Sequence, residues 1–166
     1  VYESQGDCLR GQGKDPSEAY ARALDGYEKA LSINPKYAPA ASNQAVVYQS
    51  QGDWLRGQGK DPSEAYARAL AVCERALSLN PRYAEVANNQ AVVYASQGDW
   101  LRGLGKDPSE AYARALAVCE RALSLNPRYT DAATNQANVY QSQGDWLRGQ
   151  GKDPSEAYAK ALAGYE

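Results

Sequence analysis

The sequence contains no histidine, which is the commonest general base and metal ligand in proteins. Its three cysteines, Cys8, Cys73 and Cys119, lack the paired spacing that marks a zinc knuckle or a disulfide framework. We therefore expect small apolar cysteines on buried helix faces, no cofactor, no metal, and a reducing, cytoplasmic compartment. The chain begins with Val1 rather than methionine and has no signal-like segment, so we expect a fragment or a processed chain.

Long apolar runs and a bias toward one sign of charge are also missing. No stretch approaches the roughly 20 apolar residues that a membrane-spanning helix needs, so we expect no membrane association. The 18 basic and 20 acidic residues nearly balance, and there is no charged tail. Because such a composition has no basic segment to attract phosphates, we expect no nucleic acid partner either.

What the sequence does contain is a repeat of 46 residues. Residues 38–83 and 84–129 differ at only five positions, and partial repeats 1–37 and 130–166 flank them. The Gly-Asp dipeptide recurs with the same spacing at Gly6-Asp7, Gly52-Asp53, Gly98-Asp99 and Gly144-Asp145. A fixed period of about 20 to 50 residues is typical of stacked arrays, in which each unit buries its apolar face on its neighbours. This pattern predicts a single array with a binding surface rather than an enclosed catalytic pocket.

The second half of each complete repeat predicts a helix, helix B, over about 62–79 in the first of them. Asp61 is a good N-cap, and Pro62 suits the first helical position. Apolar residues then recur every three or four positions in two adjacent stripes, so we expect the helix to be covered from more than one side. Asn80-Pro81 ends the helix, because the residue before proline avoids the helical region.

The first half of the repeat predicts helix A, from Ala38 to about Arg56, antiparallel to helix B. Gly52 lies inside helix A, where glycine costs about 1 kcal/mol relative to alanine. We expect the close approach of a neighbouring backbone to compensate for this cost. Residues 57–60 would form the turn between the helices. The alternative is a helix that ends before Gly52 and is followed by a short third helix at 53–57.

In this order, the motifs of the repeat resemble those of the tetratricopeptide repeat (TPR) family. The matching residues are Ala45, Tyr48, Gly52-Asp53-Trp54, Ala69, Ala76-Leu77 and Asn80-Pro81. The segment 88–94 is also similar to the Asn-Asn-x-Ala pattern of kinesin light chain repeats. A TPR unit has 34 residues, and the additional residues fall between Trp54 and Ala69, which predicts longer helices. The resemblance implies an all-α solenoid of antiparallel helix pairs in a right-handed superhelix, binding proteins or extended peptides in a concave groove.

Most of the differences between the repeats fall on one face of helix A. Residues 39, 42, 46 and 49 are spaced by three, four and three, which places them on the same face. The resemblance implies that this face lines the groove; the alternative is chance variation among near-identical copies. The predicted peptide-binding residues are Ser42, Asn43, Val46, Gln49, Asn88, Asn89, Val92, Ala95, Thr134, Asn135, Asn138 and Gln141. The amides at 43, 89 and 135 either bracket a peptide backbone or bond the adjoining helix.

Three other motifs have simpler explanations than chemistry. The glycine-rich segment before Lys60 lacks the serine or threonine of a phosphate-binding loop, because Asp61 follows, so we interpret it as a helix turn. Arg56 and Lys60 recur in each repeat, near Trp54, Trp100 and Trp146 in three of them, and could grip single-stranded nucleic acid, but acidic neighbours favour a salt-bridged rim. Asp61 and Glu64 form a carboxylate pair at a helix N-terminus, where capping accounts for them without catalysis.

The outer units differ from the inner ones without gaining polar caps. Gly26-Tyr27 and Gly164-Tyr165 replace the Val-Cys pair of the inner repeats. We expect the exposed ends to stack head to tail, in a heterologous contact that extends rather than closes. The leading functional hypothesis is a non-catalytic scaffold that binds a protein or extended peptide on the helix A face. The second is a self-assembling structural or designed array with no separate ligand, and an enzyme ranks a distant third.

Overall fold

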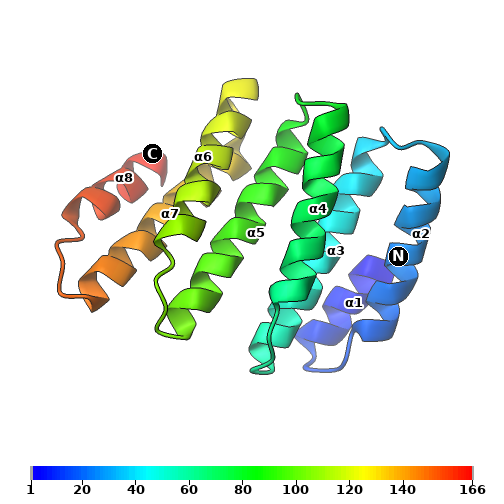
Figure 1. Ribbon diagram of the computed structural model, residues 1–166, viewed down its shortest axis with the longest axis horizontal. Coiled ribbons are helices and arrows are strands. Elements are labelled where there is room, and N and C mark those ends of the chain that lie inside the picture. Colours follow the sequence, from blue (N-terminus) through cyan, green and yellow to red (C-terminus); the bar gives the residue numbers. More distant parts are fainter. Residues whose placement is uncertain (1, 166) are drawn as a thin grey trace. The chain divides into compact units, whose positions relative to one another are not determined.

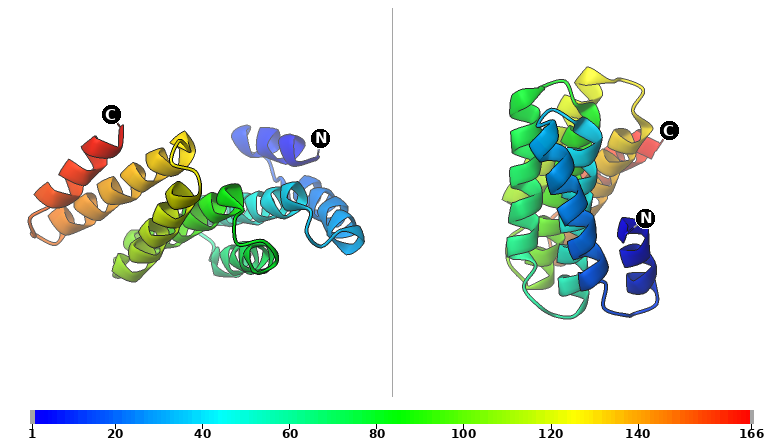
Figure 2. Two further views of the ribbon diagram at one scale, coloured as in Figure 1. Left: turned by 90° about the horizontal axis from the view of Figure 1, so that it is seen from above. Right: turned by 90° about the vertical axis from the view of Figure 1, so that its right-hand side faces the viewer.

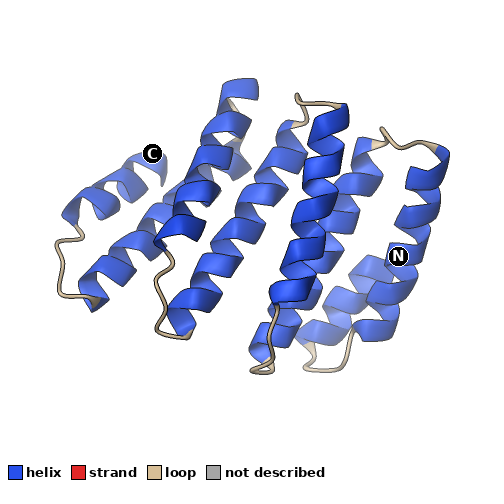
Figure 3. Ribbon diagram, viewed as in Figure 1, coloured by secondary structure: helices blue, strands red, loops and turns tan. Residues whose placement is uncertain are grey.

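The computed structural model describes residues 2–165 of the chain, so Val1 and Glu166, predicted to lie inside helices, fall outside it. The chain divides into two compact units, Val1–Asn89 and Gln90–Glu166. Across residues 2–165 every regular element is an α-helix, as the sequence predicts (Figures 1 and 3). The helices are α1 (Tyr2–Gly11), α2 (Ser17–Ile33), α3 (Ala38–Gly57), α4 (Ser63–Leu79), α5 (Ala84–Gly103), α6 (Ser109–Leu125), α7 (Thr130–Gly149) and α8 (Ser155–Tyr165). The division between units falls within α5, and the repeat boundaries drawn from the sequence stay a prediction.

The bounds of α3 and α4 match the predicted helix A and helix B to within one residue at each end. Helix α3 continues through Gly52 to Gly57, so the alternative with a separate short helix at 53–57 is wrong. The two helices run antiparallel in Figure 1 and pack along their length. Continuation past Gly52 gives α3 20 residues against the 17 of α4, which allows the partners to cover each other.

The turn after α3 is built by glycine in the left-handed region. Gly59 has a φ of 70°, which side chains rarely tolerate. The Lys60 N–H donates to the Leu55 carbonyl at 2.9 Å, and the Gly59 N–H donates to the Arg56 carbonyl at 3.0 Å. These two bonds form a Schellman motif, which satisfies carbonyls that the helix itself leaves unpaired. The glycine-rich segment is therefore a helix terminus, as predicted.

An aspartate precedes each helix that follows these turns and bonds its first serine, but the N-cap of α4 is Pro62 and not the predicted Asp61. Helix α4 begins at Ser63, whose N–H donates to the Asp61 carboxylate at 2.9 Å. The equivalent bonds reach Asp15, Asp107 and Asp153 from the serines two residues later, each at 2.9 Å. Hydrogen bonds from the serine hydroxyl and backbone N–H hold the pKa of each of these three carboxyls below its usual range. These hydrogen bonds to the first serine of each helix account for the aspartates at the helix starts.

The first unit is held together by contacts of α3 with α2 and α4, while α1 packs on α2 and α3 (Figures 1 and 2). Alanines of α3 and α4 such as Ala45 and Ala69 are fully buried and let the helices approach closely. Cys73 fills a buried position, and burial raises the pKa of its thiol to about 12. Cys119 in the second unit is equally buried. The prediction of a buried cysteine is wrong for Cys8, which is exposed because it lies on the solvent side of α1.

Each Gly-Asp dipeptide meets a tyrosine of the following helix. A Cβ atom added to Gly52 would lie 2.4 Å from Cε1 of Tyr66, whose ring is completely buried. The close neighbour of this glycine in α3 is therefore an aromatic ring. The prediction of a neighbouring backbone at this position is wrong. The Tyr66 hydroxyl donates to Asp53 at 2.7 Å. The same arrangement joins Gly6 and Asp7 to Tyr20, Gly98 and Asp99 to Tyr112, and Gly144 and Asp145 to Tyr158.

Candidate functional site

The predicted peptide-binding residues lie on α3, α5 and α7, but they differ in exposure. Ser42 and Asn88 are buried, with 1% and 6% of their surfaces exposed. The half-buried ones are Asn43, Val46, Gln49, Asn89, Val92, Ala95 and Asn135. The exposed ones are Thr134, Asn138 and Gln141. A ligand could therefore reach only part of the predicted set directly.

In the first unit, Ser42 joins α3 to the start of α5. Its hydroxyl donates to the Glu85 carboxylate at 2.7 Å and accepts from the Asn89 amide at 2.8 Å. The Asn89 amide also lies 3.4 Å from the Ser42 carbonyl oxygen. Of the two predicted roles for this amide, to bracket a peptide backbone or to bond the adjoining helix, the structure shows the second for Asn89. The Asn43 amide likewise bonds the Tyr27 hydroxyl of α2.

In the second unit, four predicted residues meet in one pocket of about 170 Å³. Val92 and Ala95 extend from α5, and Asn135 and Asn138 extend from α7. The other lining residues are Ala91, Ser96, Asp99, Val139 and Ser142. Small apolar side chains and the two asparagine amides therefore border a single hollow between neighbouring A helices.

The one ionised group of this pocket is already neutralised by the protein. Asp99 accepts a hydrogen bond from the Tyr112 hydroxyl at 2.8 Å and lies 3.4 Å from the guanidinium of Arg102. The hydroxyl of Ser142 bonds the same tyrosine oxygen. Burial, followed by the bond to Asp99, raises the pKa of Tyr112, so the phenol stays protonated. The pocket can accept uncharged groups and polar backbone, and it offers no cation to a carboxylate.

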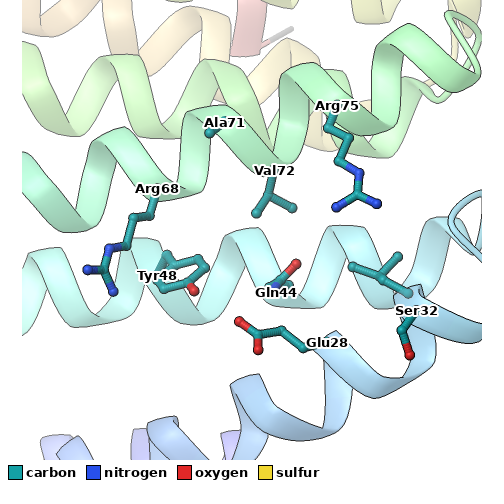
Figure 4. Close-up of a pocket in the computed structure, with 9 residues that line it drawn as sticks. Glu28, Ser32, Gln44, Tyr48, Arg68, Ala71, Val72 and Arg75 are labelled. Carbon is teal, nitrogen blue, oxygen red and sulfur yellow. The ribbon is translucent and has the colours of Figure 1, made fainter.

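A larger hollow of about 430 Å³ lies in the first unit, among α2, α3 and α4 (Figure 4). Glu28 extends into it from α2 and Arg75 from α4, with Gln44 and Tyr48 of α3 along its floor. The remaining lining residues are Leu31, Ser32, Arg68, Ala71 and Val72. The predicted peptide-binding set includes none of these residues. The recurrence of a glutamate and an arginine every 46 residues was the signal that could have found this hollow.

The recurring arginines form ion pairs, as the salt-bridged interpretation predicts. Arg56 lies 3.5 Å from Asp53, one turn earlier on α3. The equivalent pairs are Arg10–Asp7 at 3.7 Å, Arg102–Asp99 at 3.4 Å and Arg148–Asp145 at 3.2 Å. Glu64 pairs with Arg68, which leaves the predicted carboxylate pair engaged in a hydrogen bond to Ser63 and in an ion pair.

Residues 2–165 contain neither a metal-binding cluster nor a helix that could span a membrane. No three His, Cys, Asp or Glu side chains of this range gather closely enough to hold a metal ion. Within the same residues, none of the helices has both the length and the apolar character that crossing a membrane requires.

Comparison with known proteins shows similarity in structure only. No family model matches the sequence, and no curated protein matches it. The solved structure of the first TPR domain of Spaghetti (RPAP3), bound to the HSP90 peptide SRMEEVD, is similar with a TM-score of 0.55 and 20% identity. That match covers 86% of this chain and 90% of the other. A MamA double mutant is similar with a TM-score of 0.54 and 16% identity, over 99% of this chain and 73% of the other. The chain therefore has the fold of TPR solenoids.

Proposed function

We propose that this protein is a scaffold that binds an extended peptide segment on the helix A face of its second unit. The observation that carries the proposal is the pocket in which Val92, Ala95, Asn135 and Asn138 meet. The bound HSP90 peptide belongs to the RPAP3 domain, and it supports a peptide ligand for this fold without specifying its sequence. The concave groove, the superhelix and the kinesin-light-chain-like segment remain predictions drawn from the sequence.

The lining of the pocket defines the kind of peptide that fits. Its apolar part is made of alanine and valine side chains, which favour one small apolar side chain of the ligand. An asparagine amide has two donors and an acceptor oxygen, so Asn135 and Asn138 can bond a peptide backbone in addition to their bonds within the protein. Because Asp99 is paired with Arg102, we expect selection against a terminal carboxylate, which needs free cations.

The test selects linear peptides from a random displayed library on the immobilised chain. Asn138→Lys places a long cation at the rim of the pocket, at an exposed position where folding tolerates it. Selected peptides should bind this variant about tenfold more weakly or worse. The control is Ala117→Lys, which adds the same charge at an exposed position of α6. Failure to select any peptide, or equal binding by both variants at equal melting temperature, would contradict the proposal.

A self-assembling array is the second candidate function. It is favoured by the near-identity of the repeats and by the exposure of Leu162, of which 67% is accessible on α8. Its counterpart Leu24, at the same repeat position, is only 9% exposed. Catalysis ranks behind both candidates, because every acidic residue considered for it bonds the first serine of a helix or forms an ion pair. Light scattering over a concentration series would test association, and a monomer throughout would exclude it.

A further inference from the structure

One set of contacts between successive helix pairs inside a unit centres on a tyrosine hydroxyl. In the second unit, Tyr112 of α6 donates to Asp99 of α5 and accepts from Ser142 of α7. The guanidinium of Arg102 reaches the same serine, 3.4 Å from its carbonyl oxygen, and lies 3.9 Å from Asp145. One helix pair, α5 and α6, thus recognises the next A helix through a serine and an aspartate spaced by three residues.

The first unit repeats the tyrosine part of this junction. Tyr20 of α2 donates to Asp7 of α1 at 2.8 Å and accepts from the hydroxyl of Ser50 on α3. Ser50 is 8% exposed and Leu24, on the same side of α2, is 9% exposed. The recognition of an A helix by the preceding pair is therefore a recurring contact; its serine and leucine are buried in the first unit, and the equivalent Ser142 and Leu116 are half-buried in the second.

Helices α7 and α8 carry the counterparts of the residues with which α5 and α6 bind the next A helix. Within the described residues, no further A helix packs against them. We name Arg148, Tyr158 and Leu162 the α7–α8 face; they are the counterparts of Arg102, Tyr112 and Leu116. The Arg148 side chain is 69% exposed, whereas that of Arg102 is 33% exposed. Leu162 is 67% exposed. Tyr158 still donates to Asp145 at 2.9 Å, so the face is already ordered as in the occupied junction.

Helix α1 carries the residues that correspond to those of α7 bound by α5 and α6. Ser4 and Asp7 have the spacing of Ser142 and Asp145, within the same Ser-Gln-Gly-Asp sequence. Ser4 is exposed, and Tyr2 is 44% exposed, although its counterpart Tyr48 is 8% exposed. We name Tyr2, Ser4 and the exposed side of Asp7 the α1 face. It presents to solvent the groups that α7 uses to bind α5 and α6.

We propose that the α7–α8 face of one molecule binds the α1 face of a second copy and reproduces the internal junction. This inference rests on the second candidate function and names its partner and contacts. Tyr158 accepts a hydrogen bond from Ser4 of the second copy, Arg148 pairs with Asp7 of the second copy, and Leu162 becomes covered. The two faces differ, so the contact is heterologous and adds molecules in one direction.

The choice of a second copy over another partner follows from continuity with the internal junctions. The two faces match in hydrogen-bond donors, acceptors and charge, because each is a copy of a face that is already paired within the chain. Leu162 supplies apolar area for the contact. Arg148 fixes the orientation of the bound α1, because reversing α1 would move Asp7 away from Arg148. An unrelated helix would need the same serine and aspartate at the same spacing.

The test uses two variants that each disable one face. Leu162→Lys alters a side chain that is 67% exposed, and Ser4→Lys alters an exposed one, so both should fold with wild-type circular dichroism. In sedimentation velocity the wild type should grow in size with concentration. Each variant alone should associate about tenfold more weakly or not at all. Leu104→Lys, a change at a 48% exposed leucine outside both faces, is the control and should associate like the wild type.

Mixing the two variants gives the decisive result. Each retains the face that the other has lost, so an equal mixture should form a one-to-one dimer that grows no further. A mixture that stays monomeric overturns the proposal, as does a wild type that stays monomeric at all concentrations. If the wild type and both variants associate equally, self-assembly stands and the proposed faces are wrong. Peptide selection on Asn138→Lys is independent of all these outcomes.

Discussion

The hydroxyl of Tyr66 lies 2.7 Å from the Asp53 carboxylate, while the ring below it occupies the space beside Gly52. One aromatic side chain of α4 thus contacts two consecutive residues of α3. The glycine is required because the ring is there, and the aspartate is required because a buried hydroxyl needs a hydrogen-bond partner. This relationship explains why the dipeptide and the tyrosine recur together every 46 residues.

Replacing this glycine should destabilise the fold although alanine is the better helix former. In Gly52→Ala the new methyl group would lie 2.4 Å from the buried ring of Tyr66, so the ring or the helix must move. We expect a loss of about 1–3 kcal/mol, the usual range for overpacking. The control is Gly26→Ala in α2, where no atom lies within 4 Å and a gain of up to about 1 kcal/mol is expected. Urea unfolding measures both; a Gly52→Ala midpoint at or above wild type would refute the steric argument.

Removing one buried hydroxyl should weaken a whole junction. Tyr112→Phe loses the bond to Asp99 and the bond from Ser142 while leaving the ring in place. We expect a loss of about 1–2 kcal/mol in the free energy of unfolding. Tyr37→Phe, at a tyrosine that is 48% exposed, should change it by less than about 0.5 kcal/mol. Equal midpoints for the two variants would show that the hydroxyl contributes nothing to stability.

Acid should destabilise the protein through the aspartates at its helix starts. The folded-state pKa values of Asp15, Asp107 and Asp153 are depressed, so their contribution is present above the unfolded pKa and is lost as the pH falls through the folded one. We expect the melting temperature to fall below about pH 4. The triple Asp→Asn variant keeps an acceptor oxygen but cannot titrate there, so its melting temperature should fall less. The same fall in both proteins would assign the acid sensitivity to other groups.

The three thiols should react at two different rates in the native protein. Cys8 is exposed, whereas burial raises the pKa of Cys73 to about 12 and that of Cys119 to about 11. Because the thiolate is the nucleophile, an aromatic disulfide reagent should modify one thiol rapidly and two slowly. Cys8→Ser should remove the rapid phase, and urea should make the remaining thiols equally fast. Rapid reaction of two or three thiols without urea would mean that the helix pairs open readily.

The sequence was sufficient for the helices because their signals are local. Periodic apolar residues, Asn80-Pro81 and the paired glycines near 57–59 define each element within a few neighbours, and α3 and α4 begin and end within one residue of the predicted positions. The element that fills the space beside Gly52 could not be predicted this way. A helical glycine indicates a close approach, but a backbone and a ring from 14 positions away produce the same signal in the sequence.

The candidate site was less predictable for a related reason. Variation at position 42 suggested a ligand surface, yet Ser42 is buried and bonds Glu85, another variable position. Differences between near-identical repeats can therefore reflect pairing with a particular neighbour as much as contact with a ligand. The hollow bordered by Glu28 and Arg75 escaped notice because its helix B positions do not vary between the two complete repeats. Only three-dimensional contacts separate such cases.

A hydroxyl that is bonded on both sides also affects how the molecule opens. Tyr20 and Tyr112 each connect the two helices of their own pair and, through a serine, the first helix of the next. Fraying of a single helix pair would therefore break hydrogen bonds to the neighbouring pair as well as those within the frayed pair. Within each unit, amide hydrogen exchange should report openings that span more than one pair, because nearest-neighbour coupling sets the size of the cooperative segment.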